Sequence, residues 1–259
     1  MIKWNVSPDL FQLGPLTIRW YGLMFVIGGL LMSHYARRRF TNYGRDPLLV
    51  GSLTTHFIAG MTIGARLVHC LFYDPLYYLE NPLKILMVWE GGLASHGGAI
   101  GIIIAVWIFL KKHPELSFFW LLDIIVGPAA FAGGLVRIGN FFNSEIYGEP
   151  TTLPWAVVFE RVDQLPRHPT QLYEALGYFF MAAVLIWMER KKTKSYAPGS
   201  VLAVTLVLAF TFRFLIEFMK TEQSSLTTTL PINMGQLLSL GFVISGVVLW
   251  FKLNPRAKH

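Results

Sequence analysis

The chain has 259 residues, of which 54% are hydrophobic, 15% aromatic and only 14% charged. With a mean hydropathy of +0.49 it carries too few charges for an ordinary soluble domain, so its composition predicts a polytopic membrane protein. The net charge of +7 comes from basic residues dispersed over several loops, which argues against nucleic acid as a partner.

Apolar runs of about 20 residues, the length that a helix needs to cross a bilayer core of roughly 30 Å, recur along the chain. They predict an all-α integral membrane fold with about seven transmembrane helices in a single domain, residues 1–259. In chain order the predicted spans are 17–36, 50–72, 93–110, 120–137, 172–188, 199–218 and 234–251.

Lysine and arginine collect after every second span, which sets the predicted orientation. The residues concerned are Arg37, Arg38, Arg39, Arg45, Lys111, Lys112, Arg190, Lys191, Lys192, Lys194, Lys252, Arg256 and Lys258. Because cytoplasmic loops carry the excess of positive charge, the N-terminus is predicted outside and the C-terminus in the cytoplasm. The longest loop, residues 138–171, is then extracytoplasmic. The first span ends in arginines without a cleavage site, so we expect it to stay in the protein.

Two further segments and the single cysteine complete the predicted organisation. Residues 73–92 alternate aromatic and polar side chains around two prolines, as a segment lying in the membrane interface would, and residues 221–231 are predicted to be a plain outer loop. Cys70 lies inside the second span and excludes a disulfide framework. With no ligand cluster or phosphate loop in the sequence, we expect neither a metal nor another cofactor.

Polar side chains from four predicted spans fall in one layer near the outer face. They are Tyr21, His96, Arg137, Asn140, Arg213 and Glu217, followed by Asn143 and Glu145 as the chain leaves the membrane. Ionisable groups inside a membrane are costly and mark binding sites, pathways or structural bridges. The layer therefore predicts a site that opens to the outer leaflet.

Several of these residues also have simpler explanations. Arg213 and Glu217, four positions apart, fit a plain intrahelical ion pair, and Tyr21 fits an interfacial aromatic anchor. A lone histidine is often a packing residue, although the glycines around His96 leave its ring accessible for proton transfer.

Residues elsewhere in the spans have structural interpretations. The glycines, with GGL at 28, 91 and 133, fit close helix packing. Arg66, His69 and Asp123 are predicted to form internal bridges.

Two arginines from different helices at headgroup level predict recognition of an anion, because guanidinium binds phosphate in a bidentate way. Asparagines add neutral donors, and a nearby histidine or carboxylate would serve as general base. The residues alone thus predict a membrane enzyme acting on an anionic lipid. A transporter would be expected to have midplane binding residues and two related halves. A structural subunit would leave the layer of His96, Arg137 and Arg213 unexplained.

Four motifs together resemble the prolipoprotein diacylglyceryl transferase family. They are HGG at 96–98, GLVRIGNFFNSEIYG at 134–148, RHPTQLYE at 167–174 and RFLIEFMK at 213–220. The resemblance implies transfer of the diacylglyceryl group of phosphatidylglycerol to the lipobox cysteine thiol of a bacterial prolipoprotein signal peptide. A thioether forms and glycerol phosphate is released. It also implies a multi-pass protein of the bacterial plasma membrane, with its active site facing the outer leaflet.

The resemblance further implies a role for each motif residue. Arg137 would bind the phosphoglycerol group, supported by Asn140, Asn143, Glu145 and Gly148. His96, Arg213, Glu217 and Tyr21 match residues needed for catalysis. One departure is Val136, which stands where the family signature has glycine. In the mechanism we expect, the thiol loses its proton to His96 or to a base that it positions, and the arginines stabilise the leaving phosphate.

Overall fold

The structure is a computed structural model that describes residues 2–14, 16–191, 196–220 and 234–254. The chain divides into two compact units, one of residues 1–35 and 119–259 and one of residues 36–118, and each is described by itself. The single domain over the whole chain stays a prediction. The expected outer loop 221–231 lies outside the described residues, as do Lys192, Lys194, Arg256 and Lys258.

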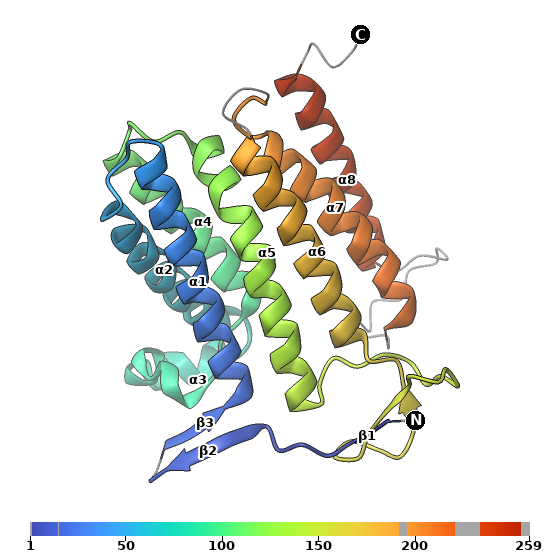
Figure 1. The fold of residues 1–259 in the computed structure, drawn as a ribbon. Helices are drawn as coiled ribbons and strands as arrows, with labels where there is room; N and C mark the ends of the chain where they lie inside the picture. The colour runs from blue at the N-terminus through green and yellow to red at the C-terminus, as the bar shows by residue number, and fades with distance from the viewer. Residues whose placement is uncertain (1, 15, 192–195, 221–233, 255–259) are drawn as a thin grey trace. The chain divides into compact units, whose positions relative to one another are not determined.

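The first unit is built mainly of long apolar helices. After the beginning of α1 (Trp20–Asn42) these are α5 (Phe118–Asn143), α6 (Thr170–Lys191), α7 (Ser200–Ile216), the short η4 (Glu217–Met219) and α8 (Met234–Leu253). In Figure 1, α5, α6, α7 and α8 run side by side. Within the described part of the chain, four helices are long and apolar enough to cross a membrane: residues 118–143, 170–191, 200–219 and 235–253. The predicted predominance of apolar helices is therefore confirmed.

Small residues let these helices approach one another closely. A Cβ atom at Gly28 of α1 would lie 2.9 Å from the Cβ of Ala132, and one at Gly134 of α5 would lie 2.5 Å from the ring of Phe179. Carbon atoms do not come this close without displacement, so only glycine fits at these contacts. The packing role predicted for the glycines is confirmed here.

Asp123 ties α5 to the beginning of α7. Its carboxylate accepts hydrogen bonds from the backbone N–H groups of Gly199, at 2.6 Å, and Leu202, at 2.8 Å. The first N–H groups of a helix have no partner within the helix, and negative charge is favourable at that end. Asp123 is thus an internal bridge, as the sequence predicts.

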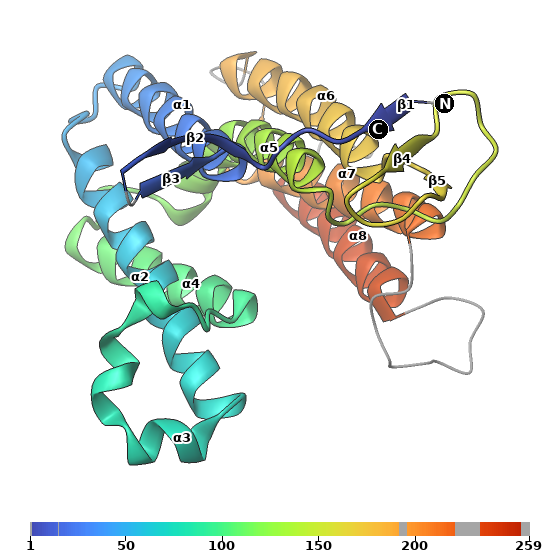
Figure 2. The same ribbon diagram turned by 90° about the horizontal axis from the view of Figure 1, so that it is seen from below.

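Two small sheets accompany the helices, and the all-α prediction omitted them. β1 (Ile2–Trp4) runs parallel to β4 (Val157–Phe159), which pairs antiparallel with β5 (Pro166–Arg167), as Figure 2 shows. β2 (Asp9–Leu13) and β3 (Leu16–Arg19) form a hairpin directly before α1. Strands this short give no clear alternation in the sequence, and β1 pairs with a segment far along the chain.

The second unit contains the rest of α1, then α2 (Leu49–Phe72), α3 (Pro75–Glu80), η1 (Pro82–Leu86), η2 (Val88–Glu90) and α4 (Ser95–Lys112). α2 and α4 lie against each other in Figure 2. Glycines allow this contact, because a Cβ at Gly101 would fall 1.9 Å from the carbonyl oxygen of Gly60. Residues 73–92, which the sequence predicts to lie in the membrane interface, form the short helical turns between α2 and α4.

The predicted spans all fall on helices, but the ends differ. Residues 17–19 belong to β3, so the first helix begins at Trp20. α5 continues to Asn143, which shortens the predicted loop 138–171 to residues 144–169. An apolar run ends at the first polar residue, whereas a helix continues as long as its backbone hydrogen bonds are satisfied.

Candidate functional site

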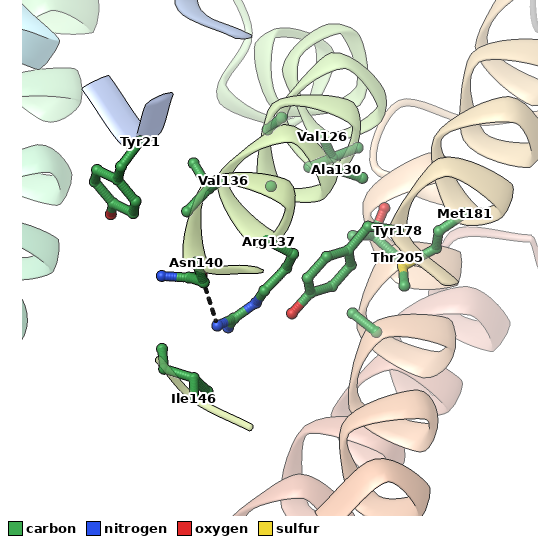
Figure 3. A pocket seen from close by; sticks show the side chains of 13 residues that line it. Tyr21, Val126, Ala130, Val136, Arg137, Asn140, Ile146, Tyr178, Met181 and Thr205 are labelled. Carbon is green, nitrogen blue, oxygen red and sulfur yellow. Dashed lines mark hydrogen bonds between the residues drawn. The ribbon is translucent and has the colours of Figure 1, made fainter. Parts of the chain in front are cut away.

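A cavity of about 540 Å³ lies within the first unit, between α1, α5, α6 and α7. Most of its lining is apolar, and its polar side chains are Tyr21, Arg137, Asn140, Tyr178 and Thr205. Figure 3 shows the guanidinium of Arg137 between Asn140 on one side and Tyr178 on the other. A concave, mainly apolar site with a few convergent polar groups is the usual form of a small-molecule or lipid-binding site.

Arg137 forms part of a buried cluster of three charges. Its Nε atom lies 3.2 Å from Oε2 of Glu174 in α6, without the alignment of a hydrogen bond. The other carboxylate oxygen of Glu174 lies 2.8 Å from Nζ of Lys220, just beyond η4. The Glu174 side chain is only 3% exposed, so two cations from different elements meet at one buried anion.

A second set of hydrogen bonds runs from Arg137 into the end of α5. Nη1 of Arg137 donates to Oδ1 of Asn140 at 3.3 Å, and Nδ2 of Asn140 donates to the Glu145 carboxylate at 2.7 Å. Asn143 donates to the same carboxylate oxygen at 3.1 Å, and Gln171 of α6 donates to the Glu145 backbone carbonyl at 2.7 Å. The polar side chains of the motif RIGNFFNSE are therefore hydrogen-bonded to one another. Glu145 orients the amide of Asn140, and this amide accepts a hydrogen bond from Arg137.

The turn that carries Glu145 has an uncommon backbone conformation. Ser144 and Ile146 adopt φ angles of 56° and 57°, in the left-handed region that residues with a Cβ rarely occupy. For a β-branched residue such as Ile146 this conformation costs of order 1–3 kcal/mol. It reverses the chain directly after α5, so that the Glu145 carboxylate points back to the asparagines and Ile146 reaches the cavity.

Gly148 connects the end of this turn to η4 and to Lys220, which follows it. It forms an antiparallel bridge with Lys220, and the N–H of Glu149 donates to the carbonyl of Met219 at 3.1 Å. A Cβ at position 148 would lie 2.4 Å from that carbonyl oxygen and 2.7 Å from Thr170. The glycine is needed for close backbone approach, and that approach places Lys220 beside Glu174.

The loop between α5 and α6 is stabilised by an ion pair of its own. Nη2 of Arg167 lies 2.6 Å from Oδ2 of Asp163. This hydrogen bond lowers the pKa of the Asp163 carboxyl below its ordinary value and raises the pKa of Arg167. Arg167 also donates to the carbonyl of Gly148 at 3.4 Å, so the loop supports the turn beside the cavity.

The structure brings together most of the residues predicted from the motif of α5. Tyr21, Arg137 and Asn140 line one cavity, and Asn143 and Glu145 are hydrogen-bonded to its edge. Gly148 acts through the backbone beside them.

Arg213, Glu217 and His96, the other predicted catalytic residues, are not among the residues that line this cavity. Arg213 of α7 is exposed, and among the described residues it has no hydrogen bond or ion pair, so the plain pair with Glu217 is not formed. Glu217 begins η4. His96, exposed near the start of α4, belongs to the second unit, and its role stays a prediction.

Reasoning from the sequence missed Glu174, Lys220 and Gln171. All three stand in the motifs RHPTQLYE and RFLIEFMK, but the charged layer was assembled from residues inside the spans. The available signal was a glutamate in the first turns of an apolar helix, since a buried carboxylate needs a cationic partner.

Known proteins are similar to this chain over most of its length. A sequence model of the family described as prolipoprotein diacylglyceryl transferase matches residues 8–252. The chain belongs to this family. Two relatives named phosphatidylglycerol--prolipoprotein diacylglyceryl transferase illustrate the similarity. That of Tolumonas auensis is 47% identical, covering 96% of this chain and 96% of its own, and that of Chloroherpeton thalassium is 46% identical, covering 99% and 96%.

A third relative with the same name, from Porphyromonas gingivalis, is 41% identical over 96% of this chain and 93% of its own. The family match, over residues 8–252, thus spans all four motifs.

Proposed function

We propose that this protein transfers the diacylglyceryl group of phosphatidylglycerol to the lipobox cysteine of bacterial prolipoproteins, the first step of lipoprotein maturation. The observation that carries the proposal is Arg137, a cation lining a mostly apolar cavity in a member of the diacylglyceryl transferase family. Guanidinium is suited to a phosphodiester, and the apolar lining is suited to the glyceryl and acyl part of a lipid.

The reaction exchanges one bond for another at the primary glyceryl carbon. The cysteine thiol gives its proton to a base, and the thiolate attacks this carbon to form a thioether. The carbon–oxygen bond to the phosphate breaks, and glycerol phosphate leaves with the bonding electrons. We assign the base role to His96, either directly or through a group that it positions.

Arg137 and Arg213 stabilise the negative charge that moves onto the departing phosphate. Such stabilisation is strong where little water is present, and removing one partner typically costs about a hundredfold or more in rate. Asn140, Asn143 and Glu145 keep Arg137 in place. Tyr21 faces the same cavity, and Glu217 is assigned a catalytic role through its position in RFLIEFMK.

For the membrane arrangement we propose seven crossings, an outer N-terminus and a cytoplasmic C-terminus. The protein lies in the bacterial plasma membrane with its site at the outer leaflet. Four helices of sufficient length and the segregation of lysines and arginines support this proposal.

The test is a direct assay of both products. Purified protein in detergent is mixed with phosphatidylglycerol and a lipobox peptide, and peptide mass and released glycerol phosphate are followed. We expect a gain of one diacylglyceryl group on the peptide cysteine, matched by an equal amount of glycerol phosphate. Arg137→Ala should abolish both signals, whereas Arg161→Ala, at an exposed loop position, should leave them unchanged.

The proposal fails if folded protein that binds lipid produces no lipidated peptide. Flux of a solute through proteoliposomes without lipid turnover would then favour a transporter.

A further inference from the structure

Glu174 is a buried carboxylate that the proposed reaction does not use. It lies in the second turn of α6, and its two oxygens face two different cations, Arg137 at 3.2 Å and Lys220 at 2.8 Å. The side chains of these cations are 19% and 9% exposed. Charges at such short distances in a buried site interact far more strongly than charges in water.

The described residues occupy only part of the guanidinium of Arg137. Its Nε faces Glu174 and one Nη1–H bonds to Asn140, so three of its five N–H groups have no partner among the described residues. Because Arg137 lines the cavity, these N–H groups are the donors that an anion there would meet.

A carboxylate beside Arg137 creates an electrostatic difficulty. Were Glu174 and Arg137 an isolated pair, their charges would cancel and the cavity would offer little attraction to a phosphodiester. Lys220 changes this balance, because it pairs with the other oxygen of the same carboxylate. Within the cluster of Arg137, Glu174 and Lys220, one positive charge remains, which equals the single negative charge of a phosphodiester. The carboxylate of Glu145 reaches Arg137 only through the amide of Asn140.

The position of Lys220 is fixed by the backbone. Its bridge to Gly148 and the hydrogen bond from Glu149 to Met219 join the end of η4 to the turn after α5. Lys220 therefore reaches Glu174 from a defined direction.

We propose that Lys220 is a positioning residue that sets the phosphate affinity of Arg137 by neutralising Glu174, while Glu174 orients Arg137. The inference rests on the proposed function only in naming phosphatidylglycerol as the ligand, since the charge balance applies to any lipid phosphodiester in the cavity. A plain structural ion pair between Lys220 and Glu174 is the alternative, and charge-reversing combinations of variants separate the two.

The experiment measures equilibrium binding of phosphatidylglycerol to the purified full chain in detergent, alongside the transfer assay. Lys220→Met leaves Arg137 facing an unneutralised carboxylate, so we expect the lipid Kd to rise about tenfold. Lys220→Arg keeps the charge and should stay within about twofold of the wild type. Adding Glu174→Gln to Lys220→Met removes the excess negative charge and should restore most of the affinity.

This restoration is the decisive result, because a structural role predicts that the double variant is as weak as Lys220→Met or weaker. Equal Kd values for the wild type and Lys220→Met would overturn the inference, and so would a double variant that fails to recover. Should Lys220→Met not fold, Lys220→Gln takes its place with the same expected order of affinities.

The binding arm distinguishes this inference from the proposed function. Binding that follows the charge balance without any transfer would contradict the proposed reaction and support the role of Lys220. If the wild type transfers the diacylglyceryl group but the lipid Kd is the same in all the charge variants, the proposed reaction is supported and the role of Lys220 is contradicted.

Discussion

Each of the two units contains a buried or mostly buried arginine, and the two arginines have different partners. Arg66 of α2, which is 3% exposed, donates to backbone carbonyls of Lys84, Ile85, Gly91 and Gly92. Arg137 of α5 meets a carboxylate and an amide, and it faces a cavity. Neutral carbonyl groups thus accept hydrogen bonds from four of the five N–H groups of Arg66, whereas Arg137 keeps three donors for a ligand.

The surroundings of Arg66 show how its arrangement is built. Its guanidinium lies over the ring of Tyr78, 5.1 Å from the centroid. Gly91 and Gly92 have positive φ angles of 91° and 69°, and a Cβ at Gly92 would lie 2.6 Å from His69. Arg66 thus holds the segment 73–92 on α2, which confirms the predicted internal bridge. The comparison teaches that a buried arginine indicates a binding site only when its donors are not exhausted by the protein.

Replacing Arg66 should have the largest effect on stability. Arg66→Lys keeps the charge, but one ammonium group cannot donate both to the carbonyls of residues 84 and 85 and to those of residues 91 and 92. Since a buried polar group without a partner costs about 1–3 kcal/mol, we expect the unfolding free energy to fall by ~3 kcal/mol or more. Thermal unfolding in detergent measures this, and proteolysis should become faster within residues 73–92. Wild-type stability in this variant would show that the hydrogen bonds of Arg66 are dispensable.

The same substitution at Arg137 should affect activity instead. In Arg137→Lys an ammonium can still pair with Glu174, so we expect the unfolding free energy to change by less than ~1 kcal/mol. The bidentate donors for phosphate are lost, and kcat/KM in the transfer assay should fall about a hundredfold. A variant that loses stability and activity in parallel would remove the distinction between the two arginines.

Apolar runs and single motifs were sufficient to predict much of this arrangement. The helices follow from hydropathy, and the clustering of Arg137 with Asn140 and Glu145 follows from their spacing near the end of one helix. The contact between Glu174 and Lys220 depends instead on how α6 meets the end of α7. No local pattern encodes such a contact, because the two residues are far apart in the chain.

The backbone conformation of the turn after α5 could not be predicted from the sequence either. Nothing in the letters NSEIYG indicates that Ser144 and Ile146 have positive φ angles, since neither residue type favours that region. The turn is stabilised by hydrogen bonds from Asn140 and Asn143, in the preceding helix, to the carboxylate of Glu145. The short strands β1 and β4 were missed for a similar reason, as each is stabilised by the other.

Ser144→Gly should sharpen the comparison by relieving strain at the Arg137 site. Ser144 is 5% exposed, and its hydroxyl has no hydrogen-bond partner among the described residues. Glycine adopts a positive φ at no steric cost, although it adds entropy to the unfolded chain. We expect a net gain of ~0.5–1 kcal/mol in unfolding free energy, measured by thermal unfolding. Ser144→Ala keeps the strain and serves as the control, and an equal gain there would assign the effect to the hydroxyl.

The smallest effect concerns the Asp163–Arg167 pair, which supports the cavity edge from the loop. The hydrogen bond that Arg167 donates to the Asp163 carboxylate lowers the pKa of Asp163 below the ordinary value of 3.8. The folded state therefore gains stability from the ionised carboxylate above that pH, and the gain is lost as the pH falls through the lower folded-state pKa. Because the Asp163 side chain is 30% exposed, the gain is modest.

The measurement compares the unfolding temperature of the wild type with that of Asp163→Asn across pH. The difference should be constant from about pH 5 upward and should shrink toward zero below the ordinary pKa of an aspartate. Asp9→Asn is the matched control, because its ion pair with Arg19 is more exposed, with side chains 47% and 68% accessible. A difference that grows as the pH falls would mean that Asp163 is stabilised in its protonated form. In that case the ion pair would not stabilise the loop. Only the hydrogen bond from Arg167 to the backbone carbonyl of Gly148 would then connect the loop to the turn beside the cavity.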